Sequence, residues 1–81
     1  MNGSNLRELT DLVSEFVDLS SVRVSEGAVF GEDIPIDSRD MLRLLSRVEA
    51  RYGVRFRPQD LLAMRTLGDL LKLIARQGGA A

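Results

Sequence analysis

Apolar residues recur at helical spacing in three stretches of the chain, and each stretch predicts a helix. These helices are expected at about 6–19, 38–53 and 67–76. Because each helix is apolar on one side only, the three can bury their apolar faces only against one another. The faces consist of Leu6, Leu9, Leu12, Val13, Phe16 and Val17 in the first helix, Met41, Leu44, Leu45, Val48 and Tyr52 in the second, and Leu67, Leu70, Leu71 and Ile74 in the third.

Capping residues mark the ends of two of these helices. The second helix is expected to begin at Asp37 or Ser38, because Asp and Ser are preferred residues at a helix start. It is expected to end at Gly53, since glycine readily adopts the left-handed conformation that stops a helix. Thr66 and Asp69 have capping-box spacing, which predicts that the last helix begins between them.

Residues 20–36 form one connection, longer than most loops between helices, which predicts an ordered functional loop. The alternation over 22–24 has no evident partner strand and is expected to be loop. A short helix is expected from about Pro58 to Met64, because proline suits the first helical position. The prediction is an all-α four-helix bundle, with three longer helices, one short helix and a long loop between the first two. Its expected core is Leu9, Leu12, Phe16, Leu44, Leu45, Val48, Phe56, Leu70 and Ile74.

With 81 residues, the chain is expected to form a single domain over 5–76, between a flexible leader at 1–4 and a flexible tail at 77–81. A domain of this size can build a modest core but no walled active-site cavity. Cysteine and histidine are absent, so the chain lacks a thiolate, an imidazole base and the usual metal ligands. We therefore expect no catalytic residue, no metal site and no enzyme activity. The lack of a long apolar run favours a cytoplasmic protein that does not bind membranes.

Charge is unevenly distributed along the chain. Residues 1–36 hold two arginines and seven acidic residues, whereas residues 37–57 hold six arginines and three acidic residues. The net charge of −1 argues against binding to nucleic acid. Within the basic segment, arginines recur every four residues, a spacing at which like charges repel by a few tenths of a kcal/mol per pair. The row is either a solvated surface offset by the acidic first helix or a partner-binding surface. The candidate partner-binding residues are Arg39, Arg43, Arg47, Arg51, Met41 and Leu42.

Three motifs and their order along the chain resemble the acyl carrier protein family over nearly the whole sequence. The motifs are Asp37-Ser38-Arg39, Tyr52-Gly53-Val54-Arg55-Phe56 and Thr66-Leu67-Gly68-Asp69-Leu70. The resemblance implies that Ser38 receives 4'-phosphopantetheine from coenzyme A through a phosphopantetheinyl transferase, with Asp37 capping the helix beside it. The thiol of that arm would carry acyl, aminoacyl or polyketide intermediates as thioesters.

The same resemblance implies a monomer that serves the transferase and acyl-transferring or synthase enzymes of fatty-acid, polyketide or other secondary-metabolite biosynthesis. Two features depart from the family pattern. Arg39 stands where leucine is usual, and the arginine row stands where the second helix is usually acidic. These departures predict a dedicated partner that bears an acidic patch.

Two other functions remain open from the residues. In the first, the protein is a non-covalent helical adaptor that docks an acidic partner through its arginine-rich helix, and Ser38 only caps that helix. In the second, the protein is a small hydrolase or transferase. The absence of histidine and cysteine disfavours this last function.

Overall fold

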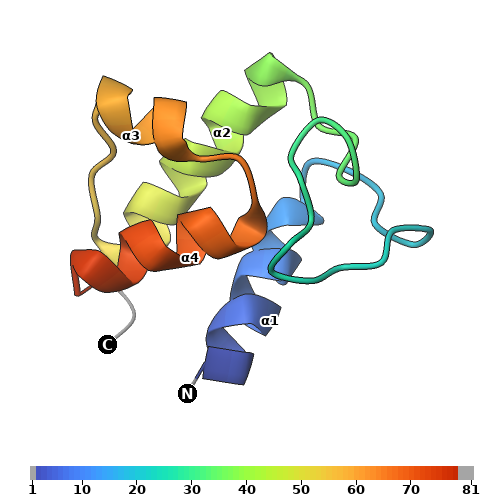
Figure 1. Cartoon of the computed structure of the whole chain (residues 1–81), viewed down its shortest axis with the longest axis horizontal. Coiled ribbons are helices and arrows are strands. Elements are labelled where there is room, and N and C mark those ends of the chain that lie inside the picture. The colour runs from blue at the N-terminus through green and yellow to red at the C-terminus, as the bar shows by residue number, and fades with distance from the viewer. Residues whose placement is uncertain (1, 79–81) are drawn as a thin grey trace.

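The computed structural model describes the backbone of residues 2–78 and the side chains of residues 6–78. Within that range, the chain forms helices α1 (Asn2–Val13), α2 (Ser38–Tyr52), α3 (Pro58–Ala63) and α4 (Leu67–Arg76) (Figure 1). Only isolated bridges, and no strand, occur in this part of the chain. The predicted all-α fold with a long loop before α2 is confirmed.

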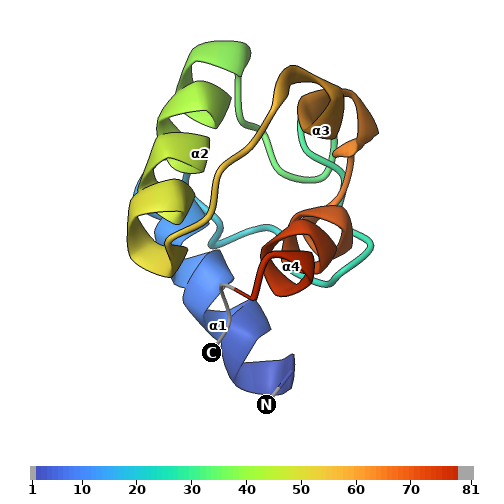
Figure 2. The same ribbon diagram turned by 90° about the vertical axis from the view of Figure 1, so that its left-hand side faces the viewer.

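The helices surround one core. Helix α1 contacts both α2 and α4, and Figure 2 shows α2 on one side of the molecule with α3 and α4 on the other. The first turn of α2 lies at the top of the molecule in both views, and the first turns of α1 lie at the bottom (Figures 1 and 2). None of the helices in the described part of the chain has the length and apolar content needed to span a bilayer.

The predicted bounds of α1 were wrong at both ends. The helix begins at Asn2, so residues 2–4, expected as a flexible leader, belong to its first turn. Residue 1 lies outside the described residues. The helix ends at Val13, after which the N–H groups of Glu15 and Phe16 donate to carbonyls three residues back, at 3.1 and 3.0 Å. The apolar spacing continues beyond this point, and therefore misled the prediction.

The predicted ends of the other helices agree closely with the structure. A carboxylate oxygen of Asp37 accepts the N–H of Asp40 at 2.8 Å and caps α2, while Gly53 ends it with φ of 69°. Thr66 and Asp69 form the expected capping box at α4, with hydrogen bonds of 3.1 Å in both directions. Helix α3 ends at Ala63, one residue short of its predicted end at 64.

The core includes residues from α1, α2 and α4 and from the long loop, but none from α3. Of the predicted core residues, only Phe16 and Phe56 are half-buried instead of buried. The long loop adds Ile34, which is fully buried, and Ala28. The buried set is Leu9, Leu12, Val13, Ala28, Ile34, Ile36, Leu44, Leu45, Val48, Val54, Met64, Leu67, Leu70, Leu73 and Ile74.

The long loop is tied to the first turn of α4 by backbone hydrogen bonds. The N–H of Leu67 donates to the carbonyl of Ala28 at 3.1 Å, and the N–H of Gly68 donates to the carbonyl of Glu26 at 2.8 Å. The first N–H groups of a helix have no partner within it, so the loop supplies the missing acceptors. A Cβ on Gly68 would lie 3.0 Å from the Glu26 carbonyl oxygen, which explains the glycine. This anchoring fixes the loop that leads into α2.

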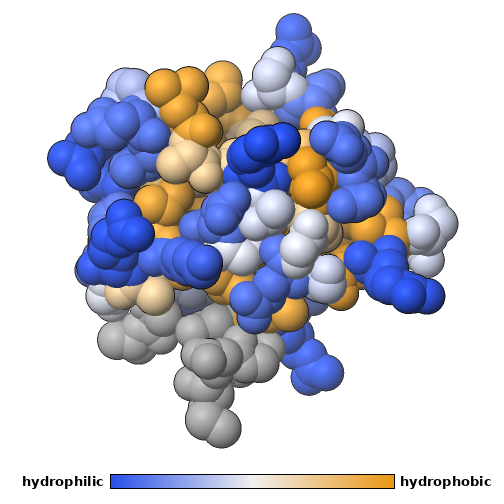
Figure 3. Space-filling view, viewed as in Figure 1, coloured by the Kyte–Doolittle hydropathy of each residue, from blue (hydrophilic) through white to orange (hydrophobic). Residues whose placement is uncertain are grey.

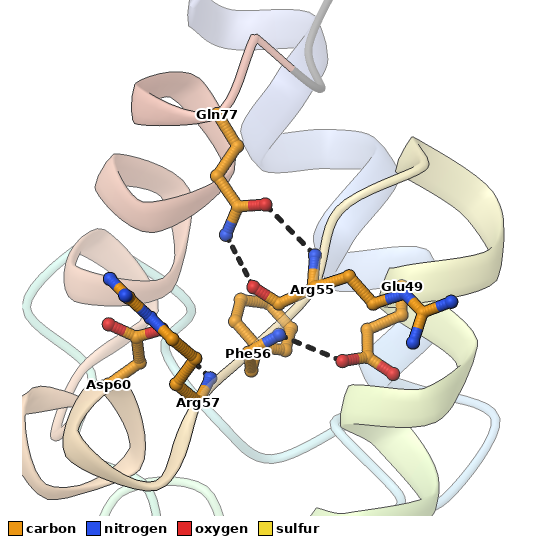
Figure 4. A network of polar contacts seen from close by, with 6 residues as sticks. All are labelled: Glu49, Arg55, Phe56, Arg57, Asp60 and Gln77. Atoms are coloured by element: carbon orange, nitrogen blue, oxygen red, sulfur yellow. Dashed lines mark hydrogen bonds and ion pairs between the residues drawn. The ribbon is translucent and has the colours of Figure 1, made fainter.

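A polar network fixes the link between α2 and α3 (Figure 4). The side-chain amide of Gln77 accepts the N–H of Arg55 at 2.9 Å and donates to its carbonyl at 2.6 Å. The carboxylate of Glu49 accepts the N–H of Phe56 at 2.8 Å. Gln77, expected at the start of a flexible tail, is therefore part of the folded structure, and residues 79–81 lie outside the described residues.

Candidate functional site

Ser38 is the first residue of α2 and is exposed to solvent. Asp37 caps the helix through its own carboxylate, and its carbonyl accepts the N–H of Met41 at 2.8 Å. Among the described residues, the hydroxyl of Ser38 makes no hydrogen bond, so the cap does not depend on it. Within the same range, the N–H groups of Ser38 and Arg39 have no protein acceptor, as expected for the first turn of a helix.

A shallow hollow of about 270 Å³ lies beside Ser38. It is formed where α2, α3 and the long loop meet, and every residue lining it except Ser38 is apolar. The hollow includes Met41 and Leu42, which the sequence suggested as partner-binding residues, but the sequence did not predict the contribution of the loop or of α3. The hollow is lined by Phe30, Ser38, Met41, Leu42, Leu45, Leu61 and Met64.

The arginine row winds around α2 instead of lying on one face. Each step of four residues advances roughly 40° around a helix with 3.6 residues per turn, so the row turns by about 120° over its length. Its first member, Arg39, is therefore nearest to the side of Ser38 and Leu42. Its last member, Arg51, is nearest to the side that packs on α1. The arginine row therefore contributes to two different surfaces. Arg39 contributes to the surface around Ser38, and Arg51 contributes to the surface next to α1.

The second half of the row is paired with α1. Nε and Nη2 of Arg47 each lie 3.1 Å from a carboxylate oxygen of Glu15. Nη2 of Arg51 lies 3.7 Å from Oε1 of Glu8, and its guanidinium lies 5.6 Å from the ring centre of Tyr52. For these two arginines, the structure agrees with the interpretation that acidic residues from the first segment of the chain offset the positive charge of the row.

These contacts shift the ionisation of the groups involved. The hydrogen bonds from Arg47 hold the pKa of Glu15 below its ordinary value, because they favour the ionised carboxylate, and Glu15 raises the pKa of Arg47. Burial raises the pKa of Tyr52, whose hydroxyl donates to Glu8 at 3.3 Å, and the charge of Glu8 raises it further. At neutral pH, the pair of Glu15 and Arg47 is therefore fully charged.

The first half of the row has weaker contacts within the chain. Arg43 pairs only with Asp40, at 3.7 Å, and its side chain is 64% exposed. Arg39 is exposed and makes no ion pair within the described part of the chain. That Arg39 and Arg43 bind a partner stays a prediction, as it does for Met41 and Leu42.

Comparison with known proteins matches the chain to a family. Residues 7–74 match the family model described as phosphopantetheine attachment site. The acyl carrier protein of Rhodococcus erythropolis is 31% identical over 71 residues, covering 88% of this chain and 78% of that protein. The acyl carrier protein of Arthrobacter sp. is 31% identical over 74 residues, or 91% of each chain. Polyketide-8 synthase acyl carrier protein 2 of Streptomyces avermitilis is 32% identical over 72 residues, covering 89% of this chain and 83% of that protein.

The residues at the start of α2 fit a phosphopantetheine group. The exposed hydroxyl of Ser38 is free to form an ester, and the neighbouring N–H groups are free to donate hydrogen bonds to a phosphate oxygen. An apolar hollow adjoins both. The capping carboxylate of Asp37 holds the helix start without using Ser38. The match over most of the chain, the helical fold and this fit agree with the resemblance read from the sequence. The chain belongs to the acyl carrier protein family, whose members carry acyl intermediates on 4'-phosphopantetheine and serve transferases and synthases without being catalysts themselves.

Proposed function

We propose that Ser38 is the residue of this carrier protein to which phosphopantetheine is attached. The observation that supports the proposal is that Asp37, and not Ser38, caps α2. The exposed hydroxyl of Ser38 is left without a hydrogen-bond partner among the described residues. In the loading reaction, Ser38 Oγ forms the phosphoester bond while the pyrophosphate bond of coenzyme A breaks and adenosine bisphosphate leaves. The transferase accepts the hydroxyl proton, since this chain has no histidine to do so.

The surroundings of Ser38 suit a phosphodiester with a long arm. The N–H groups of Ser38 and Arg39 and the positive end of the α2 dipole favour a negative charge at this point. The arm supplies a thiol, which this chain does not contain. The hollow beside Ser38 gives the first part of the arm or its cargo an apolar wall.

The cargo is an acyl intermediate, and we propose fatty-acyl or polyketide chains in particular. The relatives include proteins named for meromycolate extension and for a polyketide synthase. An apolar hollow next to the attachment point also suits such chains better than charged aminoacyl groups. The protein would act as a cytoplasmic monomer, loaded by a phosphopantetheinyl transferase and visited in turn by acyl-transferring and synthase enzymes. Neither the fold nor the relatives favour the non-covalent adaptor.

Intact mass analysis tests the attachment site. Wild type and Ser38→Ala are incubated with coenzyme A and several transferases, because Arg39 makes a negative result with one enzyme uninformative. Ser46→Ala serves as the matched control, since Ser46 is also exposed on α2. Wild type and Ser46→Ala should each gain one phosphopantetheine group, and Ser38→Ala should gain none. Its free energy of unfolding should change by less than about 0.5 kcal/mol, because Asp37 still caps α2.

Two results would contradict the proposal. Loading of Ser38→Ala would place the arm elsewhere on the chain. The absence of any modification, both in vitro with every transferase and on protein purified from its own host, would show that Ser38 is not an attachment site.

A further inference from the structure

Two exposed leucines, Leu42 and Leu61, line the hollow beside Ser38, and a third, Leu62, follows on α3. In the part of the chain whose side chains are described, the large apolar residues that are exposed are Leu42, Leu61 and Leu62, at 61%, 38% and 86%. The first is on α2 and the other two are on α3, and Figure 3 shows the corresponding apolar surface over α3 at the top of the molecule. A cluster of exposed leucines has no role in the core and is typical of a surface that another protein covers.

Two arginines lie near Leu42 on the exposed surface of α2. Arg39 lies three residues before Leu42 and four before Arg43, the spacings that make neighbours on a helix surface. The acids Asp37 and Asp40 lie on the same turn. The carboxylate of Asp37 accepts a backbone N–H, and Asp40, whose side chain is 30% exposed, pairs with Arg43. Among the described side chains, Arg39 has no acidic partner, so its exposed guanidinium is a positive charge that a partner can pair with.

The arginines at the other end of the row have partners within the fold. Arg47 pairs with Glu15, in the turn after α1, and Arg51 pairs with Glu8 of α1, each within 4 Å. No ion pair joins α1 to Arg39 or Arg43 among the described side chains. Like charges one turn apart do not stabilise a helix, so the fold itself gives no reason for Arg39.

We propose that Arg39, Arg43, Leu42 and Leu61 form a docking face for partner enzymes whose own surface is an apolar pocket edged by carboxylates. This inference rests on the proposed attachment at Ser38, because the partner must reach that residue. The leucines fill the pocket, and the guanidinium groups pair with the surrounding carboxylates. A transferase whose docking surface is lined with lysine and arginine is disfavoured by the same charges.

The test compares two transferases of opposite surface charge, one with a basic docking surface and one with an acidic docking surface. The variant Arg39→Glu/Arg43→Glu reverses the face. The control Arg23→Glu/Arg55→Glu makes the same change in net charge at two other exposed arginines. Association of the unloaded proteins with each transferase, without coenzyme A, is measured at low and high salt, and loading of Ser38 is followed separately by mass.

Wild type and the control should associate faster with the acidic-surface transferase. The reversed variant should associate at least about threefold more slowly with that enzyme and faster with the basic-surface one, and both differences should shrink at high salt. Leu61→Ser should weaken binding of the acidic-surface enzyme at every salt concentration, because the leucine contact is not electrostatic.

Equal association of the reversed variant and its control, with Ser38 still loaded in each, would overturn the docking face and leave the proposed function standing. A lack of loading in every protein, wild type included, would overturn both, and the mass spectrum separates the two failures.

Discussion

Arg47 of α2 and Glu15, in the turn that follows α1, are joined by two hydrogen bonds of 3.1 Å. The two residues are 32 positions apart in the chain. Their pairing places part of the basic second segment of the sequence against the acidic first segment. It also changes what charge reversal at Arg47 would do, since a glutamate there would face Glu15. A variant that probes partner binding should therefore alter Arg39 and Arg43 and leave Arg47 in place.

The pair should show favourable coupling in a double-mutant cycle with Arg47→Ala and Glu15→Gln, measured by urea unfolding. Arg47 lowers the pKa of Glu15 below its ordinary value of 4.5, so the carboxylate is more readily ionised in the folded state. The resulting stabilisation is present above that ordinary value and is lost as the pH falls through the lowered one. The coupling should therefore be found at pH 7 and disappear in acid.

The pair of Arg43 and Asp40 is the control for this cycle. Their closest atoms are 3.7 Å apart on an exposed part of α2, so the coupling should be close to zero at both pH values. Coupling as strong as that of Arg47 and Glu15 would show that the geometry of the bidentate pair confers no advantage.

Leu45→Ala should destabilise the protein by about 2–5 kcal/mol, because Leu45 is buried and its removal leaves a cavity beside the core. Leu42→Ala, one turn away and 61% exposed, should change stability by less than about 0.5 kcal/mol. Thermal or urea unfolding of both variants checks the pair. A similar cost at the two positions would contradict the burial pattern of α2.

Gly68→Ala should destabilise the protein although alanine is the better helix former by about 1 kcal/mol. The added Cβ would lie 3.0 Å from the carbonyl oxygen of Glu26, which accepts the N–H of Gly68, so the loop would have to move. Gly27→Ala is the control, since a Cβ there would lie 3.9 Å from its nearest neighbour, Oγ of Ser25, and the φ of Gly27 is not in the left-handed region. That control should be neutral or slightly stabilising in thermal unfolding.

Asp69→Asn should remove part of the acid sensitivity of the fold. The N–H groups of Arg65 and Thr66 donate to the carboxylate of Asp69 at 3.0 and 3.1 Å and lower its pKa below the ordinary value of 3.8. Its contribution to stability is therefore present above pH 3.8 and is lost as the pH falls through the lowered value. Unfolding by urea between about pH 3 and 5 should show a weaker pH dependence in the variant.

The sequence alone determined the elements whose ends are set by local chemistry. The cap by Asp37, the left-handed glycine at 53 and the capping box of Thr66 and Asp69 each act within one turn of helix, so the bounds of α2 and α4 follow from neighbouring residues. The carrier family was recognisable for the same reason, since its motifs lie at these helix ends. Ser38 was identified as the candidate attachment residue in this way.

The tertiary structure decided what depends on contacts between distant segments. The end of α1 could not be read from its apolar spacing, which continues past Val13 into turns that also pack against the core. The hollow beside Ser38 needs Phe30 from the loop and Leu61 from α3, which no local pattern brings together. The arginine row looked uniform because its spacing is regular, yet a step of four residues winds around a helix of 3.6 residues per turn. Only the packing of α1 against α2 decided that Arg47 and Arg51 face carboxylates while Arg39 and Arg43 remain beside Ser38.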